Sequence, residues 1–168
     1  MLYCSFVRPL LEFAAPVWNP YMRKDIEKLE RVQRKVSKLA PGLKNYDYAE
    51  RLRILDLTTL EERRKRGDLI QIFKIMKGFD KVQWHNPLRY CREVGMITRG
   101  HHLKFSRENF KINCRHHFLT NRVANAWNSL PSECVETDSV DSFKSKIDKL
   151  YERFGTYEFN YNRIAREE

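Results

Sequence analysis

Residues 24–39, with the sequence KDIEKLERVQRKVSKL, decide the fold class of this 168-residue chain. Apolar residues recur in it every three or four positions, which places them on one face of an α-helix. Basic residues follow the same spacing on a roughly opposite face, and the Pro41-Gly42 step predicts where the helix ends. The apolar face comprises Ile26, Leu29, Val32, Val36 and Leu39, and the cationic stripe comprises Lys24, Lys28, Arg31, Lys35 and Lys38.

Further helices are predicted on both sides of this stretch. Residues 2–13 are apolar enough for a buried helix, which Pro16 must end. A short amphipathic helix is expected over residues 48–55. Thr59-Leu60-Glu61-Glu62 has the form of a helix N-cap, and the helix after it should run to about Lys77, with a basic first half and a buried, apolar second half. Together these helices predict a helical bundle over residues 1–78.

The second half of the chain is predicted to be a smaller unit of mixed structure. Residues 79–100 lack periodicity and suit a linker. Alternating apolar residues on either side of a turn at 106–109 predict a small hairpin, and two amphipathic helices are expected over 119–130 and 140–154. The predicted fold is therefore mainly α: a helical bundle, then a small α+β unit over residues 101–156 made of a hairpin plus two helices, then a frayed tail over 157–168.

The charge balance indicates the kind of partner. The chain has 32 Lys and Arg against 22 Asp and Glu, a net charge of +10, which favours polyanions such as nucleic acid. Four scattered cysteines and the lack of a secretory signal favour a reducing intracellular location, nuclear or cytoplasmic. The opening apolar stretch is interrupted by Arg8, Pro9 and Glu12, so we expect no membrane-spanning helix and no membrane partner.

A second basic stretch lies between Arg99 and Arg122. It holds six cations and one acid, interleaved with phenylalanines, as expected of a phosphate track with stacking surfaces. Two other interpretations stay open: the phenylalanines are the hairpin core, and a run of charge is a solvated face. The candidate nucleic-acid contacts are the cationic stripe together with Lys104, Arg107, Lys111 and Arg115. Contacts to phosphate would bind without reading sequence.

The chemistry-bearing residues do not predict an active site. Two-metal phosphoryl chemistry needs carboxylates held together, and the chain has no Asp-Asp or Asp-x-Asp cluster. The Glu61-Glu62 pair is explained by its place in the first turn of a helix. We therefore predict no enzyme activity from this chain alone and no metal or cofactor. The zinc-capable side chains lack zinc-finger spacing and are better explained as solvated or phosphate-contacting groups: His101, His102, Cys114, His116, His117 and Cys134.

Four blocks of sequence, taken together, resemble a known protein family. They are LYCSFVRPLLEFAAPVWNP at 2–20, IEKLERVQR at 26–34, Arg51-Leu52 with 57–60 and 63–69, and Asn121-Arg122-Val123 with Trp127-Asn128-Ser129-Leu130-Pro131 and Ser142-Phe143-Lys144. In this order they closely resemble the segment after the palm in the reverse transcriptases of jockey-like and related non-LTR, or LINE-type, retrotransposons. The resemblance covers about residues 2–154.

This resemblance implies a function as well as a fold. In that family the palm carries the catalytic aspartates, and the thumb grips the template and primer behind it. The chain would then be a non-catalytic fragment of an RNA-directed DNA polymerase from a mobile element, with residues 1–78 as a thumb-like unit. Its partners would be the RNA or DNA backbone of a template-primer and the reverse-transcriptase palm. The rival hypothesis is a helical protein-interaction module that docks on an acidic partner or on such a palm.

Overall fold

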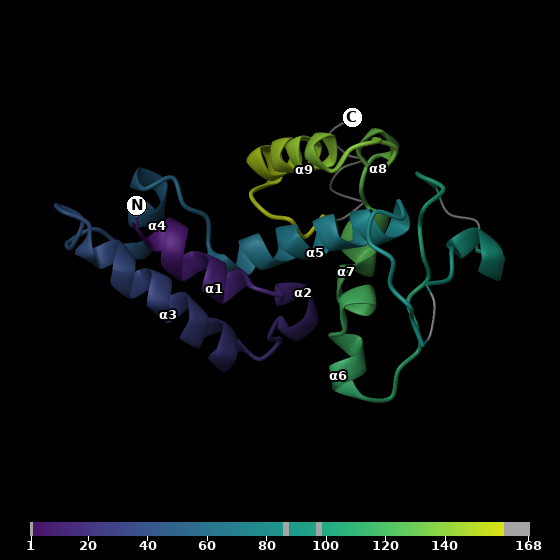
Figure 1. Cartoon of the computed structure of the whole chain (residues 1–168), viewed down its shortest axis with the longest axis horizontal. Helices are drawn as coiled ribbons and strands as arrows, with labels where there is room; N and C mark the ends of the chain where they lie inside the picture. Colours follow the sequence, from purple (N-terminus) through teal and green to yellow (C-terminus); the bar gives the residue numbers. More distant parts are fainter. Residues whose placement is uncertain (1, 86–87, 97–98, 160–168) are drawn as a thin grey trace. The chain divides into compact units, whose positions relative to one another are not determined.

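The computed structural model describes residues 2–85, 88–96 and 99–159, and these are mainly helical (Figure 1). The predicted mainly α class is therefore confirmed. In the described residues the only strand-like pairing is an isolated antiparallel bridge between Tyr90 and Phe105. The elements in chain order are η1 (Tyr3–Val7, π-helical), α1 (Arg8–Glu12), α2 (Ala15–Trp18), α3 (Arg23–Leu39), α4 (Tyr48–Ile54), α5 (Leu60–Met76), η2 (Cys91–Val94, 3-10), α6 (Asn113–His116), α7 (Leu119–Asn128), α8 (Ser132–Val135) and α9 (Val140–Phe154).

The chain divides into two compact units, Met1–Arg64 and Lys65–Glu168. The division therefore falls inside α5, whereas the sequence pattern placed it in residues 79–100. The reason is the apolar second half of α5. Its Leu69, Ile72 and Phe73 belong to the hydrophobic core that α7 and α9 complete, so this half of the helix belongs to the second unit.

In the first unit, α3 begins and ends close to where the sequence predicted. Its buried positions, however, are polar: Glu30, Gln33 and Ser37. The apolar face is only half-buried, and its last member, Leu39, is exposed. The expected apolar core face is thus wrong in detail, because hydrogen bonds rather than apolar packing hold the innermost side of this helix.

The N-terminal helix is also less buried than predicted. Of its residues only Tyr3 is buried, and the backbone turns at Ala14, where φ is +50°. Large apolar side chains here are exposed by 68 to 81%, so they form no part of a core within this unit. We call this group the N-terminal apolar set: Leu2, Phe6, Leu10, Phe13 and Val17.

The second unit has a conventional hydrophobic core centred on Trp127 of α7. Trp127 has no exposed surface, and its indole N–H donates to the Leu103 carbonyl at 2.9 Å. The rings of Phe73 and Phe143 stack with centroids 4.2 Å apart. The helices predicted over 119–130 and 140–154 are α7 and α9, and α9 begins with a Ser139 cap that accepts from the Ser142 amide at 3.1 Å.

The hairpin predicted about residues 106–109 is not formed. Phe105 bridges to Tyr90 instead, and Asn113–His116 is helical. The side-chain amide of Asn128 explains the difference. It accepts from the Phe105 amide at 3.1 Å and donates to the Phe105 carbonyl at 2.9 Å, so it uses backbone groups that a hairpin partner would need.

The predicted tail begins with packed residues rather than frayed ones. Tyr157 and Phe159 are buried in the core of the second unit. The Tyr157 hydroxyl donates to Asp148 at 2.7 Å. The same carboxylate accepts from Nε and Nη2 of Arg66, each at 2.7 Å. The remainder of the predicted tail, residues 160–168, lies outside the described residues. No helix in the described part is both long and apolar enough to cross a membrane.

Candidate nucleic-acid interface

The cationic stripe lies on the outer side of α3. All five of its residues are exposed. They are nearly opposite the line of Glu30, Gln33 and Ser37 that faces the interior, because successive helical residues are about 100° apart. Neighbouring members are about 5–6 Å apart at Cβ, and the stripe is about 21 Å long. It is therefore a continuous basic surface on one helix.

Among the residues that the structure describes, few of these cations are neutralised by an ion pair. Lys28 pairs with Asp25 one turn earlier, with Nζ 3.1 Å from the carboxylate oxygen, and both side chains are exposed. For Lys24, Arg31, Lys35 and Lys38, the described residues contain no ion-pair partner. An exposed pair such as Lys28–Asp25 is weak and gives way readily to another anion. The stripe thus offers cations that phosphate groups can neutralise.

A buried hydrogen-bond network fixes which side of α3 faces inward, and it begins at Gln33. The Tyr3 hydroxyl donates to Gln33 Oε1 at 2.7 Å. Gln33 Nε2 in turn donates to the Tyr48 hydroxyl and to the Thr58 carbonyl, each at 3.0 Å. With its oxygen and both N–H groups used, this amide has one orientation. The innermost side chain of α3 is therefore tied to three other segments of the first unit.

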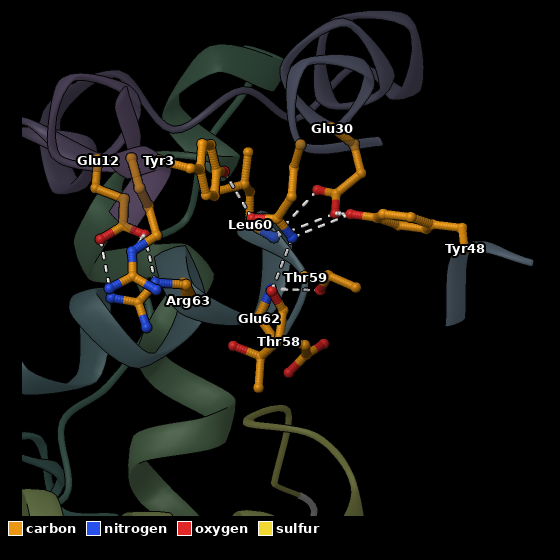
Figure 2. Close-up of polar contacts among 11 residues, drawn as sticks. Tyr3, Glu12, Glu30, Tyr48, Thr58, Thr59, Leu60, Glu62 and Arg63 are labelled. Atoms are coloured by element: carbon orange, nitrogen blue, oxygen red, sulfur yellow. Dashed lines mark hydrogen bonds and ion pairs between the residues drawn. The ribbon is translucent and has the colours of Figure 1, made fainter. Parts of the chain in front are cut away.

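Glu30 extends this network to the start of α5 (Figure 2). Its carboxylate accepts from the Tyr48 hydroxyl and from the Leu60 amide, whose nitrogen lies 3.1 Å from Oε2. Thr59 Oγ1 accepts from the Glu62 amide at 3.2 Å, as the predicted N-cap requires. A carboxylate at a helix N-terminus is favourable because the helix dipole is positive there. Glu30 therefore links the setting of α3 to the first turn of α5.

The two tyrosines of this network stay protonated at neutral pH. Burial, together with the nearby Glu12 and Glu30 carboxylates, raises the pKa of Tyr3 to about 12. Burial also raises the pKa of Tyr48, and its hydrogen bond to Glu30 adds to that shift. Both hydroxyls therefore act as hydrogen-bond donors. The sequence contained a signal for this network, since Glu30, Gln33 and Ser37 recur at helical spacing.

The second basic stretch contributes less than its composition suggested. Lys104 is buried, with 7% of its surface exposed, and its Nζ donates to the Arg99 carbonyl. Burial lowers the pKa of this lysine, as expected of an ammonium group withdrawn from water. Lys104 is therefore not placed to reach a phosphate in this structure.

The remaining predicted contacts of this stretch differ among themselves. Arg115 is half-buried, donates to Glu108 through Nε at 2.7 Å, and lies over the Phe118 ring at 4.7 Å. Arg107 and Lys111 are exposed, and neither has an ion-pair partner in the described part of the chain. Two of the four predicted cations thus remain available on the surface of this unit.

Arg122 has a structural role that its charge did not reveal. Its guanidinium binds both oxygens of Asp68 at 2.7 and 2.8 Å and also donates to the His117 carbonyl at 3.0 Å. The adjacent Asn121 accepts from the Glu108 amide at 3.0 Å and donates to the Arg115 carbonyl at 2.8 Å. This Asn-Arg block therefore anchors loops to α7, and the Arg122 charge is neutralised by Asp68.

The histidines lie in different surroundings. His101 is buried, and its Nε2 lies 3.0 Å from the Trp127 carbonyl, whereas His116 stacks on Phe110 at 4.6 Å. Within the described ranges, no three His, Cys, Asp or Glu residues are grouped in a way that could hold a metal ion.

Comparisons with protein-family models, curated proteins and solved structures returned no match. The functional argument therefore depends on the geometry of these surfaces.

Proposed function

We propose that the chain binds the backbone of nucleic acid through the cationic stripe of α3. One observation carries this proposal: four of the stripe's cations are exposed, on one helix face, with no ion-pair partner in the described residues. Phosphates spaced along a strand would neutralise several of them at once and release counterions. Such binding would be salt-dependent and largely indifferent to base sequence.

The sequence resemblance supplies the substrate class for this proposal. If the chain is a thumb-like and C-terminal piece of a retrotransposon reverse transcriptase, its ligand is a template-primer duplex. Its role would be to hold that duplex, and the polymerase chemistry would belong to a palm elsewhere. The stripe, about 21 Å long, would face about six base pairs of a duplex at 3.4 Å per pair.

The test compares two charge-matched variants for binding to a primer-template duplex at low salt. K24Q/K35Q removes two cations of the stripe, and K81Q/K149Q removes two exposed lysines elsewhere. Each phosphate contact is worth a large part of the affinity, so we expect the stripe variant to bind at least about tenfold more weakly than the control variant. Equal binding by the two variants would show that only net charge matters and would refute the proposed interface.

A second candidate function is docking on another protein through the N-terminal apolar set. Its five side chains are exposed by 68 to 81%, and exposed apolar groups concentrated in one segment often mark protein contacts. The partner that such an apolar surface fits is a reverse-transcriptase palm. The substitutions F6S/L10S should abolish capture of a purified palm after nuclease treatment. Unchanged capture by this variant would exclude the N-terminal apolar set as the docking surface.

A further inference from the structure

A cleft of about 840 Å³ lies wholly within the second unit. Its walls come from residues 88–96, from residues 105–109 and from α7. Its volume is in the range of clefts that bind small molecules or single residues of a polymer. The proposed backbone contact through α3 does not use this cleft.

The cleft favours an anionic ligand. Arg89 and Arg107 line it, both are exposed, and neither has an ion-pair partner among the residues that the structure describes. The one acidic residue in its wall, Glu108, is paired with Arg115 at 2.7 Å. Two guanidinium groups that can each bind phosphate oxygens through paired N–H groups thus lie in the wall of the cleft.

Thr120, which carries an unsatisfied hydroxyl, also lines the cleft. Thr120 is 5% exposed, and its buried Oγ1 has no hydrogen-bond partner in the described residues. Buried polar atoms are rarely left without a partner, so a ligand group that reached this hydroxyl would supply the missing hydrogen bond. Asn109 and Asn125 are exposed in the same wall, and no hydrogen bond engages either side-chain amide within the described ranges.

Apolar side chains complete the wall. Val94 and Met96 are exposed by 40% and 51%, and the buried Phe105 also lines the cleft. An adaptable thioether and a branched aliphatic side chain suit the face of a planar ring. Asparagine amides beside such a surface offer the donor and acceptor pair that matches the edge of adenine. An acidic peptide would use the arginines but would have no need of this combination.

We infer that this cleft binds an unpaired nucleotide of single-stranded nucleic acid. Arg89 and Arg107 hold the flanking phosphates, Met96 and Val94 contact the base face, and Thr120 and the amides bind the base edge. The inference rests on the proposed function only in taking nucleic acid as the polyanionic partner. It adds a second site, in the other unit and for an unpaired base.

The experiment uses the full chain and two fluorescent probes, a single-stranded DNA of about eight adenylates and a blunt duplex of about 12 base pairs. R107Q should weaken single-strand binding roughly tenfold and lower the salt slope by about 0.7, the value for one phosphate contact. T120V, which keeps the side-chain shape, should weaken it about fivefold and leave the slope unchanged. R99Q, which removes an exposed arginine that does not line the cleft, should have no such effect on single-strand affinity.

Three further measurements separate the outcomes. The cleft variants R107Q and T120V should keep wild-type affinity for the blunt duplex, whereas K24Q/K35Q should bind it more weakly. The proposal for the cleft and the proposal for the cationic stripe can therefore fail independently. Adenosine monophosphate should displace the single strand at a concentration where inorganic phosphate does not. N125A, at an exposed position, provides a second test of the base edge should T120V unfold. The inference would be overturned if R107Q bound the single strand with wild-type affinity and T120V or N125A did so too. It would also be overturned if inorganic phosphate or an acidic peptide displaced the single strand as well as adenosine monophosphate does.

Discussion

The carboxylate of Glu30, in the middle of α3, accepts a hydrogen bond from the backbone amide of Leu60, the first residue of α5, at 3.1 Å. Both residues are buried. The contact joins two helices that are thirty residues apart at this point in the sequence. It follows that the stability of the first unit and the orientation of the cationic stripe depend on the same polar side chain.

Replacing Glu30 should therefore destabilise the first unit. Glu30→Ala removes the acceptor of the part-buried Tyr48 hydroxyl and of the buried Leu60 amide, which costs about 1–3 kcal/mol. Denaturant unfolding monitored by circular dichroism measures the loss. Glu27→Ala, at an exposed position of the same helix, is the control and should change the free energy of unfolding little. Equal effects of the two substitutions would mean that the network contributes nothing specific.

The Tyr48 hydroxyl should be energetically coupled to Glu30. It donates to the Glu30 carboxylate and accepts from Gln33, so Tyr48→Phe removes one hydrogen bond from each. We expect a loss of about 1 kcal/mol from this substitution alone. In a double-mutant cycle with Glu30→Ala, which removes the acceptor, the combined loss should differ from the sum of the two single losses by at least about 0.5 kcal/mol. Strict additivity would show that the two side chains act independently.

In the second unit the buried pair of Asp68 and Arg122 should be sensitive to loss of one partner. Asp68→Asn leaves the guanidinium buried without its counter-charge, for which the expected cost is about 3–5 kcal/mol. The double variant D68L/R122M should recover most of this loss, because apolar replacement removes both charges. Thermal unfolding compares these with Asp141→Asn, which breaks an exposed pair with Lys144 and should have no measurable effect.

The second unit should lose stability in mild acid because of His101. Burial lowers the pKa of its imidazole below the ordinary value, and its Nδ1 has no partner in the described residues. As pH falls below about 6.5, His101 binds a proton in the unfolded chain before it does so in the folded one. The free energy of unfolding is therefore highest above about pH 6.5 and declines until the pH has passed the pKa of His101 in the folded state. Unfolding measured across this range should show the slope. His101→Gln should flatten it, and His85→Gln, at an exposed position, should leave it in place.

The sequence predicted helices better than it predicted the environment of individual residues. The α3, α7 and α9 helices follow directly from apolar spacing and end near the expected positions. The same spacing misidentified the buried side of α3, because Glu30, Gln33 and Ser37 are held by partners from distant segments. The helical spacing of these three residues places them on one face, but no local pattern identifies the distant partners that bury them.

The candidate site shows the same limit. All five members of the cationic stripe are exposed, as the helical period required, because the period of one helix determines which residues share a face. For Lys104, Arg115 and Arg122, helical period could not predict whether the charged side chain is exposed, buried or paired. Their burial and pairing depend on Arg99, Glu108 and Asp68, which only the tertiary fold brings to them. The expected hairpin failed for a similar reason, since the Asn128 amide takes its backbone partners.

The salt dependence of duplex binding tests the central claim most directly. Affinity of the full chain for a primer-template duplex is measured between about 50 and 200 mM salt, and the slope of log affinity against log salt is compared among variants. Reversal of all five stripe charges (K24E, K28E, R31E, K35E and K38E) should abolish binding or reduce the steepness of the slope by at least about 3, at about 0.9 per lost contact. A variant that binds the duplex with wild-type affinity and slope would contradict the account.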